Sequence, residues 1–144
     1  MDATRGEVNV EPRKDAVFKM NPSLILLVSS DPAAEAAVRD AVATSRREVR
    51  HLGSDYGAMA VIHAARAEAV LAFVDLDPGL HGYELCRAAA LHMAVIALLG
   101  EENGGAEENA REHGACACLR KPLEVARVRA VLDETLGVEA PSEL

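Results

Sequence analysis

The chain has 144 residues, and 15 Lys and Arg against 23 Asp and Glu leave a formal net charge of −8 at pH 7. Half of the residues are hydrophobic, but only 3% are aromatic and 27 are alanine, so much of the apolar share consists of small side chains. This length suits one domain with a core of its own. The acidic charge and the few aromatic side chains argue against nucleic-acid binding, which needs a cationic surface and stacking platforms.

The sequence also bears on the compartment. The longest apolar run, Leu24–Val28, is far shorter than the roughly 18–20 residues of a membrane span. The polar N-terminus lacks the charged and then apolar pattern of a secretory signal. The three cysteines are odd in number and have no disulfide-framework spacing. We therefore expect a cytoplasmic domain without membrane insertion.

Short apolar runs alternate with stretches of helical period between residues 23 and 137. The apolar runs that predict strands are 24–28, 70–74, 94–99 and 115–119, and residues 48–52 predict a short, partly exposed strand. The stretches that predict helices are about 32–42, 56–66, 83–91, 106–113 and 125–136. Continuous apolar strands that alternate with amphipathic helices are typical of a parallel sheet covered on both faces. We therefore expect an α/β fold with a doubly wound five-stranded parallel sheet over residues 23–137.

The two ends of the chain have a different character. Residues 1–22 show no sustained period and predict an N-terminal extension, either a tail or a docking segment. Its candidates for docking are Val17, Phe18 and Met20. Residues 138–144 predict a C-terminal tail. No output domain follows the last predicted helix, so we expect a stand-alone domain.

Sites in doubly wound folds lie at the carboxyl ends of the strands. The residues at those ends include Ser29, Ser30, Asp75, Leu99 and Lys121. Asp75 directly follows an apolar run, and Lys121 with Pro122 closes the last predicted strand. These residues are the first candidates for a functional site.

Three blocks of sequence at these ends occur in an order typical of a known family. They are Ile25–Val28 before a turn into Asp31 and Pro32, Phe73–Leu76 before Pro78–Gly82, and Gly114–Leu123 with its Lys-Pro pair. In these blocks the chain resembles the receiver domain of bacterial response regulators over residues 23–137. The resemblance implies a flavodoxin-like receiver fold with strand order 2-1-3-4-5.

The resemblance also implies a chemistry. In such receivers the aspartate that ends the third strand accepts a phosphoryl group from a histidine kinase, and a lysine neutralises the charge. Asp75 and Lys121 occupy these two positions. Two acidic residues after the first strand hold Mg²⁺ in the family, and here they correspond to Ser29 and Ser30. The family's switch residues, a Ser or Thr and an aromatic side chain, correspond to Leu99 and Cys118.

These replacements predict a degenerate phosphoacceptor site. Two serines in place of the acidic pair remove two negative charges from a magnesium site. Leu99 has no group that could hydrogen-bond a phosphoryl oxygen. Asp75 and Lys121 are then expected to form a partly buried ion pair. Under this hypothesis the chain has no catalytic residue, no metal and no cofactor.

The leading hypothesis is a pseudo-receiver of two-component-type signalling that acts by phosphorylation-independent protein–protein interaction. Its partner would be a signalling or scaffold protein, or a second copy of the chain. The expected surface comprises the fourth helix, fifth strand and fifth helix. Its candidate residues are Glu108, Arg111, Cys118, Arg120, Val125 and Arg129.

Two alternatives remain open. The first is a phosphoacceptor response regulator that is phosphorylated on Asp75 by a histidine kinase, with Mg²⁺ on atypical ligands and residual autophosphorylation and autodephosphorylation. The second is a small-ligand domain that uses Ser29, Ser30 and Asp75. A metal site at Cys116 and Cys118 is less favoured than two buried thiols that pack as small hydrophobic side chains.

Overall fold

The computed structural model describes residues 24–43, 45–53, 56–76, 82–100 and 105–137. The expectations for residues 1–22, 77–81 and 138–144 lie outside these ranges. In the described ranges five strands alternate with five helices. The strands are β1 (Leu24–Val28), β2 (Glu48–Leu52), β3 (Ala69–Asp75), β4 (Ala94–Leu99) and β5 (Ala117–Arg120). The helices are α1 (Pro32–Val42), α2 (Tyr56–Ala64), α3 (Gly82–Ala90), α4 (Ala106–Glu112) and α5 (Val125–Leu136).

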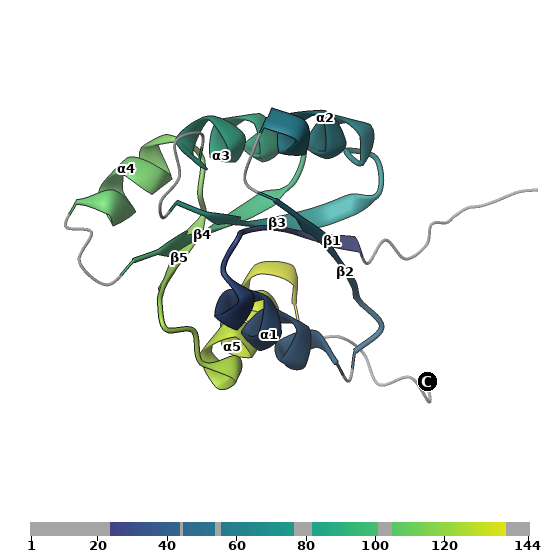
Figure 1. Ribbon diagram of the computed structural model, residues 1–144, viewed down its shortest axis with the longest axis vertical. Coiled ribbons are helices and arrows are strands. Elements are labelled where there is room, and N and C mark those ends of the chain that lie inside the picture. Colours follow the sequence, from purple (N-terminus) through teal and green to yellow (C-terminus); the bar gives the residue numbers. More distant parts are fainter. Residues whose placement is uncertain (1–23, 44, 54–55, 77–81, 101–104, 138–144) are drawn as a thin grey trace, which may run out of the picture.

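The strands form one parallel sheet in the order β2-β1-β3-β4-β5. Helices α2, α3 and α4 cover one face, and α1 and α5 cover the other (Figure 1). This arrangement confirms the doubly wound parallel fold and the order 2-1-3-4-5. All carboxyl ends of the strands therefore meet at one edge of the sheet.

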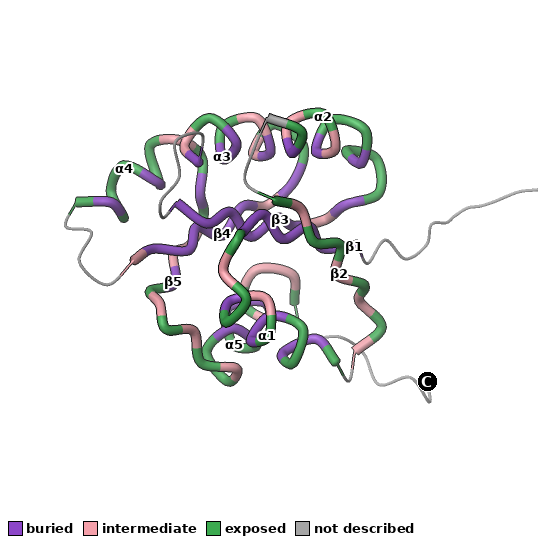
Figure 2. The backbone as a smooth tube through the Cα atoms, viewed as in Figure 1, coloured by how far each residue is buried: buried purple, intermediate pink, exposed green. Residues whose placement is uncertain are grey.

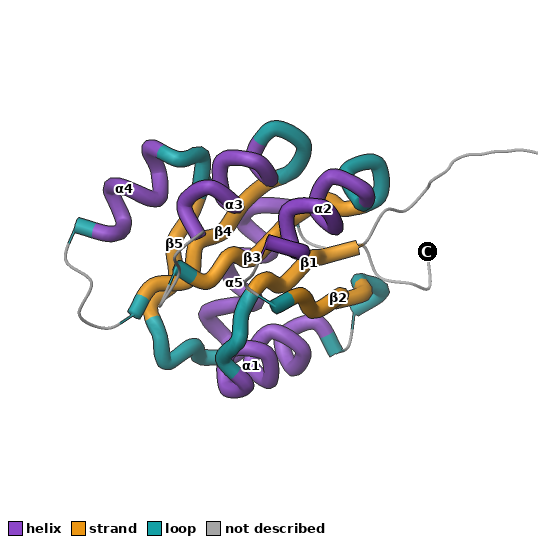
Figure 3. The backbone as a smooth tube through the Cα atoms, turned by 45° about the horizontal axis from the view of Figure 1, so that its top comes forward, coloured by secondary structure: helices purple, strands orange, loops and turns teal. Residues whose placement is uncertain are grey.

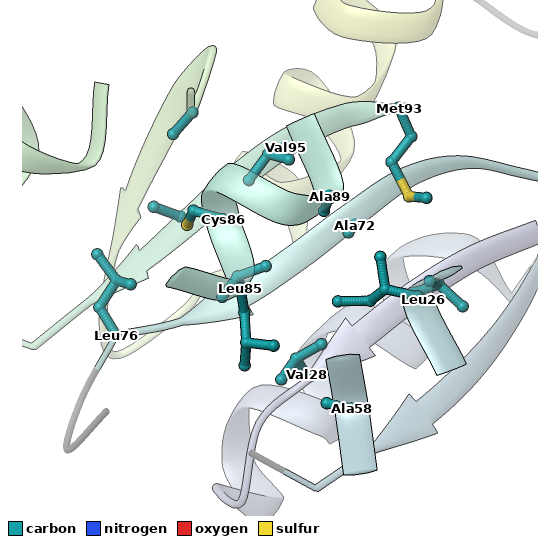
Figure 4. Packing of buried hydrophobic residues seen from close by; sticks show 14 of the residues in the cluster. Leu26, Val28, Ala58, Ala72, Leu76, Leu85, Cys86, Ala89, Met93 and Val95 are labelled. Atoms are coloured by element: carbon teal, nitrogen blue, oxygen red, sulfur yellow. The ribbon is translucent and has the colours of Figure 1, made fainter. Parts of the chain in front are cut away.

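A hydrophobic cluster fills each side of the sheet, because successive side chains of a strand point to opposite faces. Leu26 and Val28 of β1 pack against α2 and α3, where Leu85 is also fully enclosed (Figure 4). Leu27 of the same strand packs on the other face with Phe73. Because β1, β3 and β4 are covered on both sides, their residues are buried almost throughout (Figure 2).

Local signals account for several element boundaries. Asp31 is the N-cap of α1, and its Oδ1 accepts a hydrogen bond of 3.0 Å from the Ala33 backbone N–H. Pro32 follows as the first helical residue, where its missing N–H costs nothing. Gly114 follows α4 with a φ of +106°, a conformation that glycine adopts without strain.

Two boundaries differ from the prediction by two residues, and the others differ by one residue at most. The last strand begins at Ala117 rather than at residue 115, because the Ala115 backbone N–H still bonds to the Ala110 carbonyl at the end of α4. Helix α2 ends at Ala64, and a turn leads from it into β3. Within the described ranges, no helix has the length and apolar character needed to cross a bilayer.

Candidate functional site

The candidate site lies at the carboxyl edge of the sheet, where β1, β3 and β5 end. Ser29 follows β1, Asp75 is the last residue of β3, and Lys121 follows β5. The Lys121 backbone N–H donates a 2.8 Å hydrogen bond to the Leu99 carbonyl, which holds the segment after β5 against the end of β4. The peptide bond between Lys121 and Pro122 is cis. The fold thus brings Ser29, Asp75 and Lys121 together from distant parts of the chain.

Asp75 is the centre of the site. Its side chain is only 2% exposed, and Oδ2 accepts two short hydrogen bonds. One comes from the Ser29 hydroxyl at 2.7 Å, and the other comes from Lys121 Nζ at 2.8 Å. A buried carboxylate is costly unless such partners compensate its charge. Ser29 and Lys121 therefore stabilise Asp75 in its buried position.

A second carboxylate, Asp31, shares the same lysine. Lys121 Nζ lies 3.4 Å from Asp31 Oδ2, and the Asp31 backbone N–H donates to Ser29 Oγ at 3.0 Å. The sequence assigned Asp31 to the N-cap of the first helix, which the structure confirms. Its contact with Lys121 was not predicted, because a distance across 90 residues of chain has no local signal.

The surroundings of Lys121 change its pKa in opposite directions. Burial of the side chain acts most strongly and by itself lowers the pKa. The hydrogen bond that Lys121 donates to Asp75, the charge of Asp75, and the charge of Asp31 with its accepted hydrogen bond together outweigh burial and raise the pKa of Lys121 above its usual value. Lys121 is therefore a firmly protonated cation between two carboxylates at neutral pH.

His51 on β2 borders the site and was not among the predicted residues. Its Nε2 lies 2.6 Å from the Ser29 carbonyl oxygen, and its Nδ1 lies 3.6 Å from Glu35 Oε1 on α1. The strand that carries His51 was predicted, but nothing in its pattern pointed to a contact with the residue after β1. His51 thus ties β2 and α1 to the backbone at Ser29.

The residues at this edge do not fit a resident Mg²⁺ ion. Magnesium prefers an octahedral set of oxygen ligands that includes one or two carboxylates. Here the Oδ2 atoms of Asp75 and Asp31 both face the Lys121 ammonium, and Asp31 Oδ1 caps α1. Among the described residues, no group of three or more His, Cys, Asp or Glu side chains could hold a metal ion. In the described part of the chain, the cation that contacts both Asp75 and Asp31 is the Lys121 ammonium.

The two predicted switch positions contact the hydrophobic cluster beneath α2, α3 and α4, and Leu99 directly follows Leu98, the register partner of Asp75. Leu99 is fully buried in the cluster beneath α3 and α4. Cys118 is half-buried, packs against the same cluster, and its Sγ lies 3.9 Å from the Glu107 carbonyl on α4. Because Leu99 is buried in that cluster, its apolar side chain stabilises the core. Ser30, the second of the two serines, is exposed.

A groove of about 390 Å³ follows β5 between α4 and the start of α5. Cys118 and Arg120 of the predicted surface line it. Its other lining residues were not in the predicted surface set, namely Glu107, Leu119, Pro122, Leu123, Glu124 and Arg127. Mixed charges thus surround apolar side chains, a pattern typical of protein-binding surfaces.

The remaining predicted surface residues differ in position. Glu108 is exposed on α4, Arg111 pairs with Glu107 at 3.2 Å, and Val125 begins α5 half-buried. Arg129 Nε donates to the Ala41 carbonyl at 3.3 Å, so this side chain lies against α1. Positions 127 and 129 point about 200° apart around the helix, and Arg127 is the arginine of α5 that lines the groove.

The three cysteines are unpaired, as expected. Cys116 and Cys118 were predicted to be buried, but Cys116 is exposed and Cys118 is half-buried. Cys86 is buried, and that burial raises the pKa of its thiol to about 12. Cys116 is exposed because it precedes β5. Burial also raises the pKa of the Cys118 thiol. A strand that began at residue 115 would have covered both cysteines, so this error follows from the shifted strand boundary.

Comparison with known proteins agrees with this architecture. No family model matches the chain. A response regulator receiver protein from Burkholderia phymatum is similar at a TM-score of 0.69 and 25% identity, with 82% of this chain and 98% of that chain covered. A response regulator from Thermotoga maritima gives a TM-score of 0.70 at 17% identity, over 80% of this chain and 98% of that chain.

A longer protein is also similar. The structure of NtrX from Brucella abortus in complex with ADP matches at a TM-score of 0.65 and 23% identity over 78% of this chain. The chain spans about a quarter of that protein's length, 26%. The resemblance to receiver domains that the sequence indicated is therefore confirmed at the level of the fold.

Proposed function

We propose that this chain, which has the fold of a response regulator receiver domain, is a pseudo-receiver that acts by phosphorylation-independent protein–protein interaction. The observation that carries the proposal is the Lys121 ammonium between Asp75 and Asp31. It forms an ion pair with both carboxylates, and serines stand where the family has its acidic pair. The site then serves stability and shape, and the chain is not an enzyme.

The surface that supports an interaction is the groove after β5, between α4 and α5. Its apolar residues are bordered by both acidic and basic side chains, and this mixture suits a protein partner rather than a nucleic acid. A signalling or scaffold protein, or a second copy of the chain, could bind there. We place this activity in the bacterial cytoplasm, where three free cysteines would remain reduced.

A titration with Mg²⁺ and fluoroberyllate, a mimic of the phosphoryl group, tests the first half of the proposal. We expect neither the melting temperature nor the amide spectrum of the chain to change. Ser29→Asp with Ser30→Asp provides the matched control, because it restores the acidic pair. Its added negative charges should lower the melting temperature without metal, and Mg²⁺ should raise it again by several degrees.

A different result would favour the phosphoacceptor alternative, for which the proximity of Asp31 to Asp75 is the supporting observation. That alternative requires a Mg²⁺-dependent shift with fluoroberyllate that disappears in Asp75→Asn. It also requires the intact mass to increase by one phosphoryl group after incubation with a small phosphodonor. Either result would overturn the proposed independence from phosphorylation.

Charge reversal in the groove tests the second half. Arg127→Glu changes an exposed residue of the groove, whereas Arg87→Glu changes an exposed residue on α3 as a matched control. A protein captured from source cells by the native chain should be lost with Arg127→Glu and retained with Arg87→Glu. It should also be retained with Asp75→Asn. Capture that is insensitive to Arg127 would contradict this assignment of the surface.

A further inference from the structure

Helix α2 is unusual for a helix on the outside of a domain, because its nine residues include no Asp, Glu, Lys or Arg. A surface helix normally carries charged residues on its outer face, and a helix that is apolar all round is normally covered. In the described structure Gly57, Ala60 and Ala64 are nevertheless exposed, and Figure 2 shows exposed positions along the outer side of α2. This face therefore has the composition of a covered surface.

A groove of about 670 Å³ runs between α2 and α3, which lie side by side on the same face of the sheet (Figures 1 and 3). Leu91, just after α3, is 77% exposed at its border. The rings of His63 and His92 meet edge to face, with centroids 6.4 Å apart. The lining residues are Met59, Ala60, Ile62, His63, Ala88, Leu91 and His92. An apolar groove of this kind marks a binding surface.

The chain enters the fold close to this groove. Leu24, the first described residue, belongs to the same buried cluster as Ile62 of α2 and Met93 after α3. Its register partner on β3 is Ala69, at the edge of the sheet where α2 and α3 end. Residues upstream of Leu24 therefore begin beside the groove.

The sequence upstream of Leu24 contains suitable apolar side chains. Val17, Phe18 and Met20 are grouped there, and Phe18 is one of just two phenylalanines in the chain. Five residues lie between Phe18 and Leu24, so the six steps from one to the other allow a reach of up to roughly 20 Å. A helix with its side chains is about 10–12 Å across. Phe18 can therefore reach the α2–α3 groove.

The size of the groove favours a short segment over a second copy. A stable protein–protein interface involves about 20–30 residues from each partner, whereas seven residues line this groove. We propose that residues 17–20 of this chain bind the α2–α3 groove, with the Phe18 and Met20 side chains against Met59 and Leu91. The Met59 thioether and the imidazole rings of His63 and His92 line the groove. They suit an aromatic and a sulfur-containing side chain. This contact is separate from the groove after β5, which stays available to a partner.

Disulfide trapping in the full chain tests the proposal. Lys19→Cys and Ala60→Cys are combined with Cys116→Ser and Cys118→Ser, so that the side chains of Phe18, Met20, Met59 and Leu91 remain. The matched control replaces Ala60→Cys with Ala43→Cys, an exposed position just after α1 on the opposite face of the sheet. Under mild oxidation we expect the intramolecular disulfide with residue 60 to form at least about tenfold faster than that with residue 43.

The outcomes separate the possible occupants. Addition of Phe18→Ser and Met20→Ser should remove the difference in rate. Equal rates for residues 60 and 43 would overturn the proposal. Disulfides between two chains through residue 60 would also overturn it, because a second copy would then cover the groove.

Hydrogen exchange provides a second measurement that needs no cysteine. Phe18→Ser with Met20→Ser changes only residues outside the described fold, so the domain itself should remain folded. We expect amide exchange in α2 to become several-fold faster, with α1 unchanged. Unchanged exchange in α2 would overturn the proposal.

Discussion

Asp75 is a buried carboxylate whose charge is compensated by two hydrogen-bond partners. The carboxylate is 2% exposed, and it is hydrogen-bonded to the Ser29 hydroxyl and the Lys121 ammonium. Removal of one partner from a buried ion pair leaves the other charge without compensation, which costs more than the pair contributes. We therefore expect the contact between Asp75 and Lys121 to be needed for the stability of the folded chain.

The variant Lys121→Met measures that requirement. We expect it to lower the free energy of unfolding by about 3 kcal/mol, since it leaves Asp75 buried without its cation. Urea denaturation at pH 7 gives the value directly. The double variant Lys121→Met with Asp75→Asn should recover much of the loss, because no uncompensated charge remains. A loss below about 1 kcal/mol in the single variant would mean that the pair behaves like an exposed salt bridge.

The raised pKa of Lys121 also predicts a dependence on alkaline pH. A base with a higher pKa in the folded state contributes its full stability below its unfolded pKa and loses it as the pH rises through the folded value. For Lys121 the contribution is complete at neutral pH and declines above about 10.5, its ordinary value. The difference in stability between the native chain and Lys121→Met should therefore shrink above that pH. A constant difference up to about pH 11 would contradict this sign.

At the scale of elements, a glycine at each end of α4 tolerates substitution to a different degree. Gly105 before α4 and Gly114 after it both have positive φ, of +80° and +106°. They differ in their surroundings. A Cβ on Gly114 would lie 2.5 Å from the Ala90 Cβ, whereas a Cβ on Gly105 would have no atom within 4 Å. Gly114 therefore permits both the turn and the close approach of α3.

This pair of glycines separates backbone strain from steric overlap. Gly105→Ala adds strain alone and should cost about 1 kcal/mol. Gly114→Ala adds overlap with α3 to the strain, and we expect a cost of about 3 kcal/mol. Thermal or urea unfolding of the two variants gives both values. Similar costs would show that α3 moves away from the new methyl group without penalty.

At the scale of the whole molecule, the sheet joins the two hydrophobic clusters. Phe73 belongs to the cluster beneath α1 and α5, and Leu85 belongs to the cluster beneath α2, α3 and α4. Both side chains are buried, and β1, β3 and β4 contribute to both clusters. Because neither cluster can open without exposing the other face of these strands, we expect the domain to unfold as one unit.

Substitutions in the two clusters test this coupling. Phe73→Ala should lower the free energy of unfolding by about 3–5 kcal/mol, and Leu85→Ala by about 2–5 kcal/mol. Each variant should retain a single urea transition with an unchanged slope when fluorescence and circular dichroism are compared. A second transition in either variant would show that the two sides unfold separately.

The sequence by itself determined the architecture, because its signals are local. The apolar runs at 24–28 and 94–99 and the cap at Asp31 coincide with the observed elements. It also determined that Ser29, Asp75 and Lys121 lie at the carboxyl ends of strands, and it predicted the ion pair of Asp75 with Lys121. The boundary of β5 was missed because a tertiary contact, the bond from Ala115 to α4, outweighs the apolar pattern.

The tertiary structure decided what those residues do to one another. Lys121 lies between Asp75 and Asp31, His51 contacts the Ser29 carbonyl, and Arg129 lies against α1 instead of the groove. It also exposed the uncharged outer side of α2 beside Leu91. Each of these is a relation between segments distant in sequence, set by how strands and helices pack. Local periodicity specifies the elements and their ends, whereas the pairing of charges and the surfaces left uncovered depend on packing.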